Sequence, residues 1–185
     1  MDELVFHKAK TGNPAAFEEL ISSYEKLIFN ASYRMMGNTQ DAEDISQEVI
    51  IKVYKNLAAC KSAAAFKSWL FRIINNSCID EMRRRKGKTA LSLDASQNDG
   101  ESYIENPVLR DDITPESEYL RKDTNKKIQQ AIDNLPPDYK AVIVMRDING
   151  MSYEEIAEAL ALSMGTVKSR IARGRKKLML ALSPT

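Results

Sequence analysis

Apolar residues recur every three or four positions along most of the chain, which is the spacing of a helix with one buried face. The segment "NPAAFEELISSYEKLIFNASYRMMG" follows this rule from residue 13 and ends at Gly37, a helix-terminating residue. The segments 39–56 and 65–87 repeat the pattern, and the second ends at Gly87. Alternation of the kind expected for strands is scarce. The pattern therefore predicts an N-terminal domain of three to four helices over residues 1–88.

Residues 89–115 interrupt the helical pattern. They are rich in Asp, Asn, Ser, Gly and Pro, which favours a flexible, weakly structured linker. Beyond them a helix is predicted from about residue 116 to 134, followed by Pro136 and Pro137 and by further helices. The predicted fold is therefore all-α, with two small helical domains, 1–88 and 116–185, joined by a flexible acidic linker over 89–115.

The last part of the chain has the pattern of a helix-turn-helix. Ser152 followed by Glu155 is a capping box, which opens one helix, and Ser163 is suited to cap a second helix after a short turn. The turn between them carries Ala161 where glycine is the usual residue. Either the turn avoids the left-handed conformation, or Ala161 adopts it at a cost of about 1 kcal/mol.

Charge is distributed unevenly, although the formal net charge is only +1. Residues 1–88 carry +3, residues 89–118 carry −7, and residues 119–185 carry +5. Six basic side chains fall between Gly165 and Leu178, and no acidic residue follows Glu158. This asymmetry indicates an anionic partner for the C-terminal domain.

The basic segment can be placed on a helical wheel. Val167, Ile171, Gly174 and Leu178 form one narrow stripe that would face the core, and the polar side chains flank it or point away. Such a helix suits the major groove of DNA, with outward side chains at base edges and flanking cations at phosphates. A solvated basic face is the alternative. The DNA-binding candidates are Thr166, Lys168, Ser169, Arg170, Arg173, Arg175, Lys176 and Lys177.

Several other classes of protein are disfavoured. The longest apolar run is only about five residues, too short for a membrane span, and the N-terminus lacks a signal-peptide pattern. One histidine and two widely spaced cysteines favour neither a zinc site nor a disulfide framework. The chain has no Gly-rich phosphate loop or nucleophile motif. We therefore expect a cytoplasmic, non-enzymatic protein with no cofactor, no metal and no small-molecule substrate.

Three blocks of sequence together resemble the extracytoplasmic-function (ECF) group of bacterial sigma factors. "LPPDYKAVIVMRDINGMSYEEIAEALALSMGTVKSRIARGRKKL" is similar to that group's C-terminal domain, which reads the −35 promoter element. "GNTQDAEDISQEVIIKVYKN" and "FKSWLFRIINNSCIDEMRRRK" resemble two stretches of its N-terminal domain. The blocks occur in the right order, so the resemblance covers nearly the whole chain.

The resemblance implies partners and roles. Asp41, Asp44 and Glu48 are spaced to form one exposed acidic stripe of a helix. By the resemblance, this stripe and Gln47 would bind the β′ clamp helices of core RNA polymerase, and the β subunit would be a further contact. Acids near a helix N-terminus also suit the helix dipole, which is the alternative for Asp41. Members of the group are usually silenced by an anti-sigma factor, and an anti-sigma factor is therefore expected for this chain.

The resemblance also implies a surface that opens the −10 element. Trp69 would stack on an unpaired base or, alternatively, belong to the core, and Asn76 would contact DNA or cap a buried backbone group. The loop before Trp69 is rich in alanine, which leaves the base-reading residue open. The implied −10 candidates are Lys61, Ser62, Lys67, Trp69, Arg72, Asn76, Arg83, Arg84 and Arg85, and Lys86 follows them.

Two functions are weighed on these features. The first is an alternative sigma factor that binds core polymerase, reads both promoter elements and helps to open DNA. The second is a stand-alone helix-turn-helix transcriptional regulator, for which specific DNA binding without polymerase would be the distinguishing property.

Overall fold

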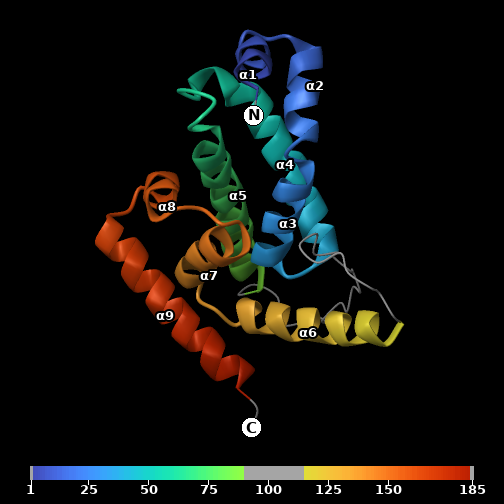
Figure 1. Ribbon diagram of the computed structural model, residues 1–185, viewed down its shortest axis with the longest axis vertical. Coiled ribbons are helices and arrows are strands. Elements are labelled where there is room, and N and C mark those ends of the chain that lie inside the picture. Colours follow the sequence, from blue (N-terminus) through green and yellow to red (C-terminus); the bar gives the residue numbers. More distant parts are fainter. Residues whose placement is uncertain (1, 90–114, 184–185) are drawn as a thin grey trace.

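The structure is a computed structural model that describes residues 2–89 and 115–183, and every regular element in those ranges is helical (Figure 1). The first range holds α1 (Glu3–Lys10), α2 (Pro14–Ser22), α3 (Glu25–Met36), α4 (Thr39–Asn56), the 3-10 turn η1 (Leu57–Ala59) and α5 (Phe66–Thr89). The second range holds α6 (Pro115–Asp133), α7 (Pro137–Ile143), the π-helical turn η2 (Val144–Ile148), α8 (Tyr153–Leu160) and α9 (Met164–Leu182).

The N-terminal part contains more helices than predicted. The Asp2 carboxylate caps α1 by accepting from the backbone N–H of Leu4 at 2.8 Å, and that helix was not predicted. The pattern from residue 13 to Gly37 is split into α2 and α3, because Ser23 Oγ donates to the Leu20 carbonyl and Tyr24 N–H turns back to Ile21. The prediction of three to four helices was therefore too low for this part of the chain.

The predicted end of the third segment was also wrong. The helix α5 continues through Gly87 to Thr89 rather than stopping at the glycine. A glycine inside a helix costs only about 1 kcal/mol relative to alanine, so it does not by itself end a helix. The predicted linker at 90–114 lies outside the described residues, and α6 begins one residue before the predicted position.

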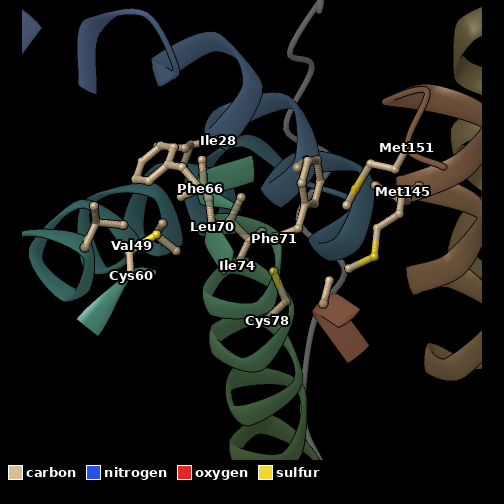
Figure 2. Packing of buried hydrophobic residues seen from close by; sticks show 14 of the residues in the cluster. Ile28, Val49, Cys60, Phe66, Leu70, Phe71, Ile74, Cys78, Met145 and Met151 are labelled. Atoms are coloured by element: carbon tan, nitrogen blue, oxygen red, sulfur yellow. The ribbon is translucent and has the colours of Figure 1, made fainter. Parts of the chain in front are cut away.

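The core is built around α5 (Figure 2). The Phe66 ring is fully buried and meets Phe6 and Tyr24 edge to face, with ring centroids 5.9 Å and 5.0 Å away. Further along α5, Phe71 lies beside Met145 and Met151, which come from the C-terminal part. Buried side chains of both parts thus form one continuous cluster, so the two halves of the chain pack against each other.

Polar contacts join the same two halves. Arg34 Nη1 donates to Gln129 Oε1 at 2.9 Å, and Lys140 Nζ donates to the Met35 carbonyl at 3.2 Å. Met35 is in the last turn of α3, where unpaired carbonyls and the helix dipole attract a cation. The Lys140 side chain is only 8% exposed. Burial lowers the pKa of this amine, and nearby Asp133 opposes that effect.

Candidate functional site: a recognition helix, an acidic face and the α5 surface

The helix-turn-helix forms as predicted, and local caps fix both of its helices. The N–H of Glu155 donates to Ser152 Oγ at 3.1 Å, and the N–H of Ser152 donates to Glu155 Oε2 at 2.6 Å, which completes the capping box of α8. Ser163 caps α9 by accepting from the N–H of Thr166 at 3.2 Å. These caps fix the residues at which α8 and α9 begin.

The turn between these helices uses a left-handed residue. Ala161 has φ 52° and ψ 46°, and among the described residues it is the only non-glycine residue with positive φ. The N–H of Leu162 then reaches back to the Ala157 carbonyl at 2.9 Å. The turn therefore does not avoid the left-handed conformation. Ala161 adopts it, at the steric cost that glycine would not have.

The inner face of α9 matches the predicted stripe. Val167, Ile171 and Gly174 are buried, and Leu178 is half-buried. Gly174 is needed for close approach to α7, because a Cβ there would lie 2.9 Å from Cγ1 of Ile143. The stripe therefore fixes the rotation of α9 and decides which of its side chains point outward.

The cations of α9 fall into two groups. Arg170 is bound to Asp138 at 3.1 Å, and Arg175 forms two hydrogen bonds to Asp147, which raise the pKa of its guanidinium. The other four are exposed and form no ion pair with any described residue; they are Lys168, Arg173, Lys176 and Lys177.

The two candidate hydroxyls of α9 are used locally. Ser169 Oγ donates to the Thr166 carbonyl at 3.0 Å, and the Thr166 hydroxyl lies 2.9 Å from Ser163 Oγ. Both contacts help to hold the first turn of α9. Each hydroxyl would have to exchange or share that hydrogen bond in order to contact DNA.

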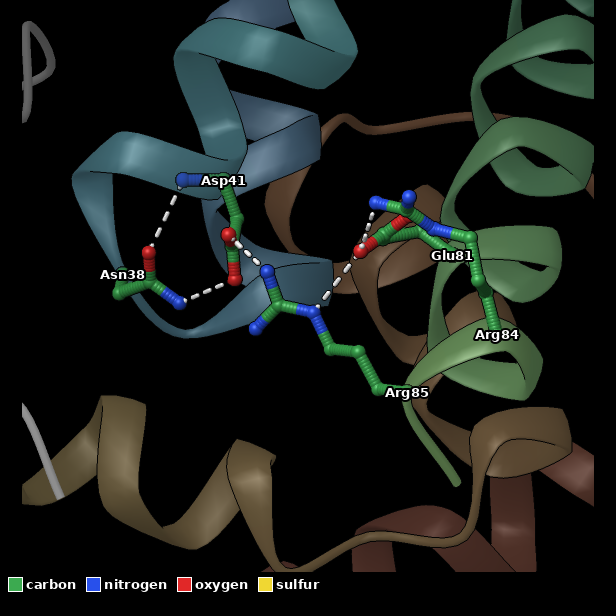
Figure 3. Close-up of polar contacts among 5 residues, drawn as sticks. All are labelled: Asn38, Asp41, Glu81, Arg84 and Arg85. Atoms are coloured by element: carbon green, nitrogen blue, oxygen red, sulfur yellow. Dashed lines mark hydrogen bonds and ion pairs between the residues drawn. The ribbon is translucent and has the colours of Figure 1, made fainter. Parts of the chain in front are cut away.

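The acidic face of α4 contains fewer residues than predicted. Asp41 is only 7% exposed, so the prediction that it lies on an exposed stripe was wrong. Its carboxylate accepts from the side chain of Asn38 and pairs with Arg85 from the far end of α5 (Figure 3). Asp41 therefore ties the start of α4 to α5. Nothing local in the sequence indicates a partner 44 residues away.

The remaining candidates on α4 are accessible. Asp44, Gln47 and Glu48 are all exposed on one side of the helix. Glu48 forms an ion pair with Lys52 one turn on, and Lys52 also donates to Ser77 Oγ on α5 at 2.9 Å. The exposed set presents two carboxylates and one amide to a partner, and Lys52 is paired with one of those carboxylates.

Six of the predicted −10 residues lie along the first half of α5 and in the loop before it. Lys61, Ser62, Arg72 and Asn76 are exposed. Trp69 is half-buried, with its ring centroid 5.9 Å from that of Phe66, so it packs at the edge of the core. Lys67 instead donates to the Asn149 carbonyl of the C-terminal half at 3.2 Å. The structure thus brings most of this set together but leaves Lys67 engaged within the chain.

The arginines further along α5 are already paired. Arg84 donates to both oxygens of Glu81, at 2.7 Å and 2.9 Å, and Arg85 reaches Glu81 as well as Asp41 (Figure 3). The hydrogen bond from Arg84 is the main reason that the pKa of Glu81 is lowered. Arg83 lies 3.9 Å from Asp80 in an exposed pair. Glu81 was not anticipated, although its spacing of three and four residues from two arginines is a signal for such pairing.

A groove of about 400 Å³ separates part of α5 from the C-terminal half. Asn76 and Arg83 line its α5 side, and Asp138, Leu160 and Arg170 line the other. Candidates for both DNA-reading surfaces thus face the same groove.

The described ranges contain neither a metal-binding cluster nor a membrane-spanning helix. No three His, Cys, Asp or Glu side chains there gather closely enough to hold a metal ion. Among the helices in those ranges, none combines the length and apolar character needed to cross a membrane. Both cysteines in the chain, Cys60 and Cys78, are buried free thiols.

Comparison with known families matches both halves of the chain. Residues 10–88 match Sigma-70 region 2, and residues 125–178 match Sigma-70 region 4. The ECF RNA polymerase sigma factor SigW of Bacillus subtilis is 36% identical over 171 residues, which cover 92% of this chain and 91% of that protein. The RNA polymerase sigma-H factor of Pseudomonas aeruginosa is 32% identical over 183 residues, 99% of this chain and 94% of that protein.

Solved structures share the fold. The sigma factor RpoE of Bartonella quintana, solved in complex with the anti-sigma factor NepR, has a TM-score of 0.70 at 22% identity, over 90% of this chain and 96% of that one. CnrH, solved with the cytosolic domain of CnrY, has a TM-score of 0.69 at 24% identity, over 98% of this chain and 96% of that one.

Proposed function

This chain belongs to the ECF group of RNA polymerase sigma factors, the transcription initiation factors that direct polymerase to particular promoters, and we propose how three of its surfaces divide that work. The exposed set on α4 binds core polymerase, the first half of α5 reads and opens the −10 element, and α9 reads the −35 element. Residues 1–88 and 116–185 act as the two promoter-reading domains. The chain works by binding alone, in the cytoplasm, without chemistry of its own.

The observation that carries the proposal is the orientation of α9. Its buried stripe turns Arg173 and Lys176 outward on a helix anchored at Ser163. We propose that outward side chains contact base edges and that Lys168 and Lys177 contact phosphates. Arg170 and Arg175 remain in the proposed set, although each would share its guanidinium with an acid of the same domain.

The proposed polymerase contact consists of Asp44, Gln47 and Glu48. Their exposure on one side of α4 supports the proposal, while the burial of Asp41 gives that residue a structural role instead. We further propose an anti-sigma factor as a partner. Support comes from RpoE of the same fold, which was solved with such an inhibitor.

For the −10 element, we propose that Lys61, Ser62, Trp69, Arg72 and Asn76 form the reading surface. Stacking of a base on an aromatic side chain contributes about 1–3 kcal/mol, and a half-buried Trp69 still presents part of its ring. Lys67 joins this surface once its bond to Asn149 is released. Arg83 and Lys86 lie exposed at its far end, with Arg83 loosely paired to Asp80. Arg84 and Arg85 are exposed as well but would first have to exchange their carboxylate partners.

The proposal is tested by binding of the purified chain to bacterial core RNA polymerase. Glu48→Arg replaces an exposed acid of the docking set, and we expect it to weaken binding at least tenfold. Glu19→Arg on α2 is the matched control, because it makes the same charge change at an exposed site outside the set. Equal loss in both variants would point to net charge rather than a docking face. A folded wild-type chain that fails to bind core polymerase, yet binds specific duplex DNA tightly, would favour the stand-alone regulator.

A further inference from the structure

The loop of residues 60–65, which leads into α5, is held at both ends by the first helix, α1. At the start of the loop, Lys10 Nζ donates to the Cys60 carbonyl at 2.6 Å. Just past its end, the buried Phe66 ring meets Phe6 of α1 edge to face, with ring centroids 5.9 Å apart. Phe6 and Lys10 are four residues apart and therefore lie on the same side of α1. One helix thus anchors both ends of this loop.

The loop has little of its own that could hold its backbone in place. Three consecutive alanines occupy positions 63–65, and an alanine side chain offers no polar group and buries little area. The Cys60 thiol is buried, but its hydrogen bond goes to the nearby Ser62 carbonyl at 3.5 Å. Lys10 instead reaches the loop from another helix, 50 residues earlier in the chain. Such a contact restricts a backbone that would otherwise sample many conformations.

The side chain that this anchor places is Lys61. It is exposed, and its backbone nitrogen belongs to the same planar peptide group as the Cys60 carbonyl that Lys10 holds. The other two polar candidates near this loop are used within the chain. Ser62 Oγ accepts a backbone N–H at the start of α5 at 3.2 Å, and Lys67 donates to a carbonyl of the C-terminal half.

From these contacts we propose that Lys10 is a positioning residue for recognition of the −10 element. By holding the Cys60 carbonyl, it fixes the peptide group that carries Lys61 and so determines which base Lys61 meets. A side chain whose backbone is already fixed loses less conformational freedom on binding, which favours discrimination between bases. The inference rests on the proposed function of the loop and assigns a part of that function to α1.

The base preference of the holoenzyme, the full chain bound to core polymerase, tests the proposal. The probe is a pool of partly single-stranded DNA in which the −10 segment is randomised, and the bound fraction is sequenced. Lys10→Met removes the donor but keeps a long side chain that favours a helix. We expect the preference at the most selective −10 position to fall about fivefold, as for the loss of one hydrogen bond. Lys8→Met, the control, removes the same charge from an exposed site of α1 and should leave the preference unchanged.

Two further variants separate positioning from charge. Lys10→Arg retains a cationic donor, so we expect it to restore the base preference. In a chain that carries Lys61→Ala, Lys10→Met should have no further effect, because the side chain that Lys10 places is gone. Effects of the two substitutions that add in full would contradict an action of Lys10 through Lys61.

The native thiol of Cys60 reports the position of the loop directly. It is buried, and burial raises its pKa, so it should react slowly with a maleimide while the loop is held. We expect labelling of Cys60, identified by peptide mass, to be about fivefold faster in Lys10→Met than in wild type or Lys8→Met, because the loop opens more often.

The outcomes distinguish this inference from the proposed function. An unchanged base preference in Lys10→Met would overturn the inference and leave the proposed function intact. An equal loss of −10 preference and of binding to −35 duplex would also overturn it, because such a loss reflects general unfolding. A wild-type holoenzyme without any base preference in the −10 segment would overturn the proposed role of the loop, and this inference with it.

Discussion

Cys78 is the buried ionisable group whose environment most clearly favours its neutral form. It lies fully buried on α5 at the centre of the core, and burial raises the pKa of its thiol to about 12. Lys140 is near enough to oppose this effect without cancelling it. The thiol therefore remains protonated and unreactive in the folded chain at physiological pH.

A pH dependence of stability follows from that shift. The folded-state pKa is above the ordinary value of 9.0, so the stabilising contribution is complete below about pH 9 and is lost as the pH rises toward 12. We expect the free energy of unfolding to fall by up to about 1.4 kcal/mol per pH unit in that window because of Cys78. Denaturant unfolding of wild type and Cys78→Ala at pH 8 to 11 measures it. If the free energies of unfolding of wild type and Cys78→Ala changed equally with pH across this range, the raised pKa of Cys78 would be contradicted.

Two arginines on α9 differ in their surroundings and should differ in their effect on DNA binding. Arg173 points outward without an ion pair in the described structure, whereas Arg175 is held by Asp147. We expect Arg173→Ala to cost about 1–3 kcal/mol on a promoter with an intact −35 element, because a base contact is lost. Fluorescence anisotropy of the holoenzyme on intact and scrambled −35 sequences measures this difference.

Arg175→Ala is the matched variant for this comparison. It removes a flanking cation, so we expect a smaller loss that is uniform across DNA sequences and a shallower salt dependence. If the effect of Arg173→Ala were equally uniform, Arg173 would be a phosphate contact and base reading would have to come from other residues of α9.

At the scale of the element, the turn between α8 and α9 carries conformational strain. Ala161 adopts the left-handed conformation, which glycine reaches without a steric cost. We expect Ala161→Gly to raise the free energy of unfolding by about 0.5–1 kcal/mol. Ala172→Gly, at an exposed site inside α9, should lower it by about 0.5–1 kcal/mol, because glycine is unfavourable in a helix interior. Thermal unfolding of the two variants measures these changes in the free energy of unfolding. If both variants were less stable than wild type, the proposed strain at Ala161 would be contradicted.

Elements whose ends are fixed by neighbouring residues could be predicted from the sequence. The capping box at Ser152 and the cap at Ser163 act over three residues, and both helices start where the pattern indicated. The break between α2 and α3 could not be predicted, because apolar residues continue at helical spacing through Ser23 and Tyr24. The spacing of apolar residues indicates which face of a helix is buried. It does not reveal a break between two helices when the same spacing continues across the break.

In the candidate sites, too, features set by neighbouring residues were predictable, and features set by distant residues were not. The orientation of α9 follows from its own apolar stripe, so its outward residues were predictable. The burial of Asp41 depends on Arg85 at the far end of α5, and the engagement of Lys67 depends on Asn149, 82 residues away. Contacts of such separation are set by how helices pack, which local spacing does not encode.

At the scale of the whole molecule, the proposed binding surfaces differ in how exposed they are. The docking face on α4 and the outward face of α9 remain exposed, while part of α5 is covered by α8 (Figure 1). The three proposed binding surfaces are thus not equally exposed in this structure.

The lysines that join the two halves both bind main-chain carbonyls, Lys67 that of Asn149 and Lys140 that of Met35. A main-chain acceptor survives almost any substitution of the residue that carries it. Asn149 and Met35 can therefore change their side chains without deleting the acceptor, so each of these contacts depends on its lysine alone.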